Sequence, residues 1–203
     1  MKTINIFAIM MVAVVVGLIG FCVENIWLAF SKGFMDNRNM CLPFLLGYGI
    51  AMLLVYILFG LPHRPLFFGT KVVIKSSVRR YMYYYLMIVI CICVGEILLG
   101  KTVEKICGFQ WWNYSWIPLH ITQYTSIPTS MGFSAIVFLF MRYCLELLMN
   151  LFLGLNEKTL VLMSLLFGII LSIDMVYNLY LIYKNGEGTV RWRIEFKGKG
   201  LVL

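Results

Sequence analysis

Long apolar runs dominate this chain and limit what it can fold into. Five segments hold about 20 or more mostly apolar residues, the helical length needed to cross the roughly 30 Å hydrocarbon core of a bilayer. They cover roughly residues 4–29, 42–61, 81–100, 127–150 and 160–183. The 203-residue chain is 62% hydrophobic and only 13% charged, which is more apolar surface than a soluble domain of this size can bury. The pattern predicts an all-α polytopic membrane protein with about five transmembrane helices.

Two segments depart from the helical pattern. The stretch that follows the third run has no charged residue between Ile106 and Met141, which leaves a sixth crossing there as an alternative. Its polar residues and prolines instead predict a re-entrant or interfacial aromatic segment. Residues 189–197 ("TVRWRIEFK") alternate apolar and charged residues, which is typical of an amphipathic strand. The expected organisation is a helical membrane domain over residues 1–183 and a basic, strand-like tail over residues 184–203.

The second link also contains a short strand-like stretch, "PLFFGTKVVIKSS". If this link and the tail lie on the same side of the membrane, the two strands are expected to pair. The first apolar run is expected to be a retained span, because Glu24 and Trp27 stand where a signal peptide needs small residues.

The net charge of +8 has its source in the links between the apolar runs. Basic residues in such links set orientation and contact anionic headgroups, so the expected partner is the lipid bilayer and not nucleic acid. Placing the N-terminus outside leaves nine Lys and Arg residues on the cytoplasmic side against seven outside. This small margin favours an external N-terminus.

The six cysteines fall mostly inside the apolar runs. They form no C-x-x-C pair, and Cys91 and Cys93 diverge around a helix, so they are interpreted as small buried hydrophobic residues. No metal and no cofactor are expected.

Ionisable residues inside the apolar runs need a partner or a role, since each costs several kcal/mol in hydrocarbon. Arg142 and Glu146 are four residues apart on one predicted helix, and an ion pair between them is expected. Asp174 has no opposite charge in its own span. Two roles are left open for it, a hydrogen-bonding group inside the helix and a relay carboxylate.

A second set of charges lies near the ends of the first and third runs. Glu96 and Glu104 are about 12 Å apart along a helix and about 80° apart in azimuth, with Gly100 between them. They share one broad face, which the glycine lets a neighbouring segment approach. Glu24 and Arg38 bracket the first link, on the same predicted side of the membrane. The charges are therefore expected to meet at one interface; the alternative is a set of separately solvated groups.

The stretches "GFCVENIWLAFSKGFMDNRNMCLPFLLGYGIAMLL" and "GEILLGKTVEKICGFQWWNYSWIP" carry a family resemblance. They resemble the bacterial membrane family described as putative ABC-transporter type IV, the CmpB-like permeases, over roughly residues 15–145. The matching positions are Gly20, Phe21, Glu24, Asn37, Arg38, Pro43, Tyr48, Gly49, Glu96, Glu104, Lys105, Trp111, Trp112, Tyr114, Ser115 and Pro118. The chain departs from the pattern at Asn113 and Asn39, where the family has Asp and Gly, and at "LHITQY" after Pro118.

The resemblance implies that these residues form one polar, substrate-binding pocket. Its expected residues are Glu24, Asn37, Arg38, Tyr48, Glu96, Glu104, Trp111, Trp112, Asn113 and Tyr114, with Arg142, Glu146 and Asp174 as an ion pair or relay. Asn113 puts in doubt any chemistry that needs the aspartate of the family.

Three functions fit this sequence. The preferred one is a multi-pass permease-like subunit of the bacterial plasma membrane that transports or exports a small substrate. The chain has no G-x-x-x-x-G-K-[ST] motif, so such a subunit would work with a partner ATPase or as a homo-oligomer. The first alternative is a non-catalytic membrane partner for assembly, immunity or sensing, which the strand-like tail favours. The second is a membrane-embedded enzyme acting on a lipid or lipid-linked substrate, for which no nucleophile or metal motif is present.

Overall fold

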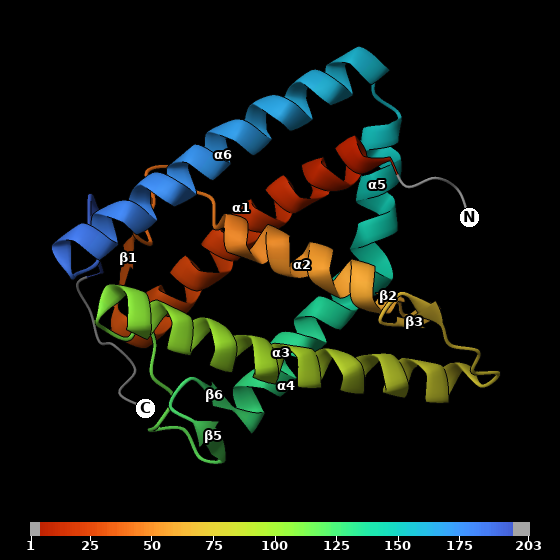
Figure 1. Ribbon diagram of the computed structural model, residues 1–203, viewed down its shortest axis with the longest axis horizontal. Coiled ribbons are helices and arrows are strands. Elements are labelled where there is room, and N and C mark those ends of the chain that lie inside the picture. The colour runs from red at the N-terminus through yellow and green to blue at the C-terminus, as the bar shows by residue number, and fades with distance from the viewer. Residues whose placement is uncertain (1–4, 197–203) are drawn as a thin grey trace. The chain divides into compact units, whose positions relative to one another are not determined.

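The computed structural model describes residues 5–196 (Figure 1). Residues 1–4 and 197–203 lie outside the described part, and with them the first residue of the first predicted run and the tail lysines Lys197 and Lys199. The helices are α1 (Ile6–Lys32), α2 (Leu46–Phe59), α3 (Ser77–Cys107), α4 (Ile127–Leu139), the π-helix η1 (Phe140–Cys144), α5 (Leu145–Leu153) and α6 (Glu157–Asn185). The strands are β1 (Phe34–Asp36), β2 (Gly60–Leu61), β3 (Arg64–Phe67), β4 (Thr70–Lys71), β5 (His120–Thr122), β6 (Thr125–Ser126) and β7 (Arg193–Glu195).

Local sequence signals set the ends of the long helices. The side chain of Asn5 accepts hydrogen bonds from the N–H groups of Phe7 and Ala8 at the start of α1. Gly33, at the other end of α1, adopts φ 73°, a left-handed conformation that favours glycine. An asparagine cap and a left-handed glycine cap also bound α6. These caps provide hydrogen-bond partners for backbone N–H and C=O groups at the helix ends, which have no partner within the helix.

Four helices of the described chain are long and apolar enough to cross a membrane: α1, α3, the continuous α4–η1–α5 and α6. They confirm four of the five predicted runs. The remaining run is only partly helical, because α2 begins at Leu46 and ends after 14 residues at Phe59. Pro43 lies in the irregular stretch before it, and Gly60 turns the chain with φ 68°. A fifth full-length helix, as predicted, is therefore not confirmed.

Residues 108–126 contain no helix. They form turns and the antiparallel pair β5–β6, which joins His120 to Ser126 and Thr122 to Thr125. A sixth helical crossing is thus absent from this stretch. Its re-entrant or interfacial character stays a prediction.

The chain forms two compact units. The first contains residues 5–51 and 149–196 of the described chain, and the second contains Met52–Leu148. In the first unit α1 and α6 pack side by side along their lengths (Figure 1, red and blue). In the second unit α3 packs against α4. The expected boundary between residues 183 and 184 stays a prediction.

The predicted strand of the tail is confirmed over Arg193–Glu195, but its expected partner is wrong. β7 pairs antiparallel with β1, with Phe34 opposite Glu195 and Asp36 opposite Arg193. The guanidinium of Arg193 lies 4.2 Å from the centre of the Phe34 ring. The strand-like stretch of the second link pairs locally instead, in the three-stranded order β2–β3–β4. A tight turn in that link closes a local ladder, whereas β1 follows the helix that packs against α6 and so lies beside the tail.

Close backbone contact joins α1 to the start of α2. A Cβ atom on Gly49 would lie 2.3 Å from the carbonyl oxygen of Ala13, which is too close for any residue but glycine. Gly47, two residues earlier and on the opposite side of α2, has nothing within 4 Å of the equivalent position. Alanine at Gly49 therefore tests the packing contact, whereas alanine at Gly47 tests helix propensity alone.

We expect Gly49→Ala to destabilise the protein and Gly47→Ala to leave it unchanged or slightly more stable. The first must displace backbone atoms, a kind of overpacking that costs typically about 1–3 kcal/mol. The second only removes the helix penalty of glycine, about 1 kcal/mol. Thermal unfolding of both variants in the same detergent measures the difference, and equal midpoints would contradict the close contact.

Candidate functional site

The first polar cluster consists of Glu24, Asp36, Arg38 and Tyr48, and is called here the Arg38 cluster. The Arg38 guanidinium donates to one carboxylate oxygen of Glu24 from Nε at 2.7 Å, and its Nη2 lies 2.6 Å from the same oxygen. The Tyr48 hydroxyl donates to the other oxygen at 2.7 Å. Asp36 lies 3.6 Å from Nη1. Three of the predicted site residues, Glu24, Arg38 and Tyr48, are therefore brought together.

Backbone geometry holds this cluster in place. Arg38 and Asn39 both adopt positive φ, 47° and 63°, and the Arg38 N–H donates to Asp36 Oδ1 at 2.8 Å in an Asx turn. Gly20 makes room for the Tyr48 ring, because a Cβ there would lie 2.7 Å from Tyr48 Cγ. The Glu24 and Arg38 side chains each keep 28% of their surface exposed. The ion pair is thus built by the fold yet open to a ligand.

Asn37 does not join this cluster, although it was predicted as a site residue. It is 2% exposed, and its amide donates to the carbonyls of Met40 at 2.9 Å and Thr189 at 3.0 Å. Its oxygen accepts from the Arg191 N–H at 2.9 Å. Asn37 therefore fastens the tail to the segment after α1.

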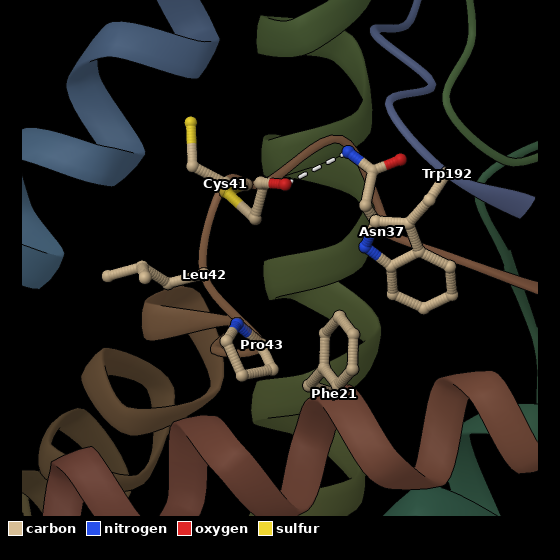
Figure 2. Close-up of a pocket in the computed structure, with 7 residues that line it drawn as sticks. Phe21, Asn37, Cys41, Leu42, Pro43 and Trp192 are labelled. Atoms are coloured by element: carbon tan, nitrogen blue, oxygen red, sulfur yellow. Dashed lines mark hydrogen bonds between the residues drawn. The ribbon is translucent and has the colours of Figure 1, made fainter.

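A small cavity lies beside Asn37 in the same unit (Figure 2). Its volume is about 260 Å³, and its lining residues are Phe21, Asn37, Met40, Cys41, Leu42, Pro43 and Trp192. The rings of Phe21 and Trp192 meet edge to face, with centroids 6.4 Å apart. The cavity wall is therefore mainly apolar and aromatic, with the Asn37 amide as a polar group.

Asp174 binds backbone, and it forms no ion pair within residues 5–196, the part that the structure describes. Its carboxylate accepts from the N–H of Cys41 at 3.0 Å and of Leu42 at 3.3 Å, and from the Asn178 amide at 2.9 Å. Arg191 in turn donates to Asn178 at 2.7 Å. Of the two roles left open for Asp174, these contacts favour the hydrogen-bonding group, here directed at irregular backbone that lies outside its own helix.

The second polar cluster surrounds Glu96 on α3 and is called here the Glu96 cluster. One carboxylate oxygen of Glu96 lies 2.5 Å from Thr125 Oγ1 and 3.0 Å from Ser130 Oγ, and the two hydroxyls are 2.8 Å apart. Both hydroxyl residues are fully buried. The three oxygens form a closed triangle of contacts.

The number of hydrogens in this triangle bears on its chemistry. As three separate hydrogen bonds the contacts need three hydrogens, and the two hydroxyls supply only two. A proton on Glu96 provides the third and also removes a charge from an apolar stretch, where a lone carboxylate is costly. The geometry therefore suits a neutral, protonated Glu96 that can release and regain its proton.

Glu104 lies two turns further along the same helix. It accepts hydrogen bonds from the Tyr124 hydroxyl and, at 3.0 Å, from the Gln110 amide. Its carboxylate raises the pKa of Tyr124 by accepting the phenolic hydrogen. The Tyr124 ring packs on Gly100, where a Cβ would lie 2.4 Å from the ring. Glu96 and Glu104 thus face one segment, and the side chain that approaches the glycine between them is a tyrosine.

The aromatic residues after α3 act mainly as supports. Trp112 donates from its indole to the Tyr124 carbonyl at 2.8 Å, and the Tyr114 N–H donates to the Gln123 carbonyl at 2.8 Å. Asn113, which stands where the family has Asp, accepts from the Ser115 N–H at 2.8 Å and donates to Gln110. The buried indole N–H of Trp111 has no hydrogen-bond partner among the described residues. This network holds Tyr124 and Gln110 against Glu104.

The expected ion pair between Arg142 and Glu146 is absent from the described structure. Glu146 lies 3.1 Å from the Arg64 guanidinium and 3.6 Å from the His63 ring. The Arg142 guanidinium lies over the rings of Tyr81 and Tyr143. The reason is local: η1 widens the helix between residues 140 and 144, so the i,i+4 alignment of a regular α-helix does not hold there.

The sequence reasoning missed Thr125, Ser130, Tyr124 and Gln110, which are the direct partners of Glu96 and Glu104. A signal for three of them was present in "QYTSIPTS", residues 123–130, where hydroxyl residues crowd the start of an apolar run. Hydroxyls at that position are expected to bond either the helix start or a neighbouring helix. Among the described residues, no group of three or more His, Cys, Asp or Glu side chains is placed to hold a metal ion.

Comparison with known proteins gives the class of this chain. A family model described as "Putative ABC-transporter type IV" matches residues 11–179. The chain therefore belongs to that family, and its apolar helices make it a membrane protein of the ABC-transporter type. Searches of curated proteins and of solved structures found no significant match. That the Arg38 cluster and the Glu96 cluster form one pocket stays a prediction.

We expect Asp174→Asn to destabilise the protein by about 1–3 kcal/mol, the cost of leaving a buried N–H without an acceptor. The amide keeps only one oxygen for the N–H groups of Cys41 and Leu42. Glu157→Gln, in the exposed first turn of the same helix, is the matched control and should cost under about 1 kcal/mol. Thermal unfolding in detergent measures both, and equal effects would show that Asp174 does not hold this backbone.

Proposed function

We propose that this protein is a permease-type subunit of the bacterial plasma membrane that moves a small substrate, with Glu96 as its proton-binding group. The observation that carries the proposal is the triangle formed by Glu96, Thr125 and Ser130. A carboxylate inside a spanning helix is costly unless it has a role, and such residues mark ion and proton pathways in transporters. Membership in an ABC-transporter-type family supports the same class of function.

The Arg38 cluster supports the binding of a charged or strongly polar group. The Glu24 carboxylate and the Arg38 guanidinium are partly exposed, and a ligand carrying an opposite charge can replace one member of the ion pair.

Energy coupling needs a partner under this proposal. The chain has no G-x-x-x-x-G-K-[ST] sequence, so ATP hydrolysis would be supplied by another subunit. A homo-oligomer driven by a proton gradient is the other arrangement that fits, and it uses the same Glu96 chemistry.

The two other functions gain no specific support. The partner-subunit hypothesis was drawn from a strand-like tail with a free edge, but β7 pairs with β1 of its own chain. For the enzyme hypothesis, His120 is a candidate acid or base, but it is exposed and its ring lies 3.1 Å from the Ile117 carbonyl in a turn. Neither feature gathers further reactive groups around itself.

We expect Glu96→Gln to abolish proton exchange at this site while the fold is kept. The amide can still bond both hydroxyls but cannot release a proton. Infrared difference spectra between acidic and neutral buffer should show a protonated carboxylic acid band in the wild type that is lost in Glu96→Gln and kept in Glu24→Gln. Persistence of the band in Glu96→Gln would assign the proton to another residue.

Transport is tested separately in proteoliposomes that trap the pH dye pyranine. A panel of amino acids, small organic cations and small organic anions should include at least one compound that moves protons through the wild type. Glu96→Gln should lower that flux at least about tenfold, whereas Lys101→Gln, an exposed change on the same helix, should not. Full flux in Glu96→Gln would remove Glu96 from the pathway, and no flux with any compound would count against proton-coupled transport.

The partner ATPase is tested by purification. We expect the tagged chain, taken from its native membrane in mild detergent, to carry with it a subunit that contains a phosphate-binding loop and hydrolyses ATP. A preparation that contains this chain alone and still transports in liposomes would instead establish the homo-oligomer.

A further inference from the structure

The directions of α1 and α6 constrain how often the chain crosses the membrane. A Cβ on Gly168 would lie 3.2 Å from the Met10 side chain, so the first halves of the two helices are level with each other. The strands that follow the two helices pair directly, with Phe34 opposite Glu195. The two helices therefore run in the same direction and end on the same face (Figure 1).

Two spans that run in the same direction must be separated by an odd number of crossings. Between α1 and α6, the described chain has only two helices of spanning length, α3 and the continuous α4–η1–α5. Two crossings would leave the chain on the face where α1 ends, whereas α6 must begin on the face where α1 begins. A third crossing must therefore come from the remaining segment of the chain, between Gly33 and Ser76.

The segment from Asn37 to Gly49 has the path of the first part of a crossing. It runs antiparallel to α1: the Asp36 N–H donates to Asn25, the Leu45 N–H donates to the Gly17 carbonyl, and Gly49 packs on Ala13. From Asn25 to Ala13 the path covers about 18 Å along α1, and α2 continues for about 15 Å beyond Gly49. The rest of α2 is long enough to complete a crossing of the roughly 30 Å hydrocarbon core.

The first half of this path is not helical, yet the N–H groups of residues 40–45 have acceptors. Asp174 accepts from the N–H groups of Cys41 and Leu42, the Phe44 N–H donates to the Leu42 carbonyl, and Pro43 has no N–H to satisfy. Irregular backbone is tolerated at membrane depth only where protein supplies such partners. Asp174 thus supplies the hydrogen-bond acceptors that the N–H groups of a non-helical crossing need.

We infer that the chain crosses the membrane five times and that its second crossing is discontinuous, irregular over residues 37–45 and helical over Leu46–Phe59. The second link then lies on the face where α1 begins, and the tail lies on the face where α1 ends. The inference does not depend on the proposed transport function.

Three variants with one added cysteine each test the crossing count: Lys32→Cys at the end of α1, Lys71→Cys in the second link and Glu187→Cys after α6. All three positions are exposed. A membrane-impermeant maleimide is applied to right-side-out and to inverted vesicles, and the wild type gives the background of the native cysteines. We expect Lys32→Cys and Glu187→Cys to label from one face and Lys71→Cys from the other.

Labelling of Lys32→Cys and Lys71→Cys from the same face would overturn the inference, since the segment between them would then not cross. Labelling of Lys32→Cys and Glu187→Cys from opposite faces would overturn the parallel arrangement of α1 and α6 on which the count depends. Labelling of all three in detergent shows that each thiol is reactive. If one variant fails to accumulate, Ser31→Cys, Thr70→Cys or Lys184→Cys replaces it at the neighbouring level of the chain.

Discussion

The structure depends on one constraint, the need to pair backbone polar groups where water is scarce. Long helices meet it by themselves, because each N–H finds a carbonyl four residues back. The segment between β1 and α2 cannot, and it obtains partners from elsewhere in its unit: the carboxylate of Asp174, the carbonyl of Gly17 and the amide of Asn37. The close fit of Gly49 on Ala13 follows from the same requirement, because the start of α2 must approach the α1 backbone before its own hydrogen bonds begin.

Polar side chains in this protein therefore fall into two groups with different physical roles. Asn37 and Asp174 bond mostly to main chain and are nearly fully buried, which is the behaviour of structural residues. Glu24 and Arg38 bond to other side chains and stay partly exposed. Glu96 contacts two hydroxyl groups, which supply one hydrogen fewer than three separate hydrogen bonds need. Side chains of the second kind can change partner or protonation state without breaking a helix, which is why the proposed chemistry rests on them.

Much of the fold could be predicted from the sequence, and the failures have identifiable causes. Apolar length and family motifs gave four long helices and the family itself, because both are properties of contiguous residues. The second run was predicted as a whole helix because composition does not reveal that residues 42–45 bond to α1 and α6, far away in sequence. The partner of the tail strand was missed for the same reason.

For the candidate site, spacing on one helix correctly placed Glu96 and Glu104 toward one segment, because azimuth depends only on local geometry. It could not supply Thr125 and Ser130, which come from the next element of the chain. The Arg142–Glu146 pair failed because a π-turn breaks the spacing rule, and its position is not marked by any residue type.

The first unit is built from two segments that lie far apart in the sequence, and this has a consequence for biosynthesis. Cys41 and Asp174 are 133 residues apart in the chain, so the irregular segment is made long before its carboxylate partner. At about 5–20 residues per second, the ribosome needs roughly 7–27 s to reach Asp174. During that interval the nascent segment carries unpaired N–H groups, and a shielding factor such as the insertion machinery would have to cover them. The assembly of this unit is therefore complete only at the end of translation, which makes a chain truncated before α6 a natural target for membrane quality control.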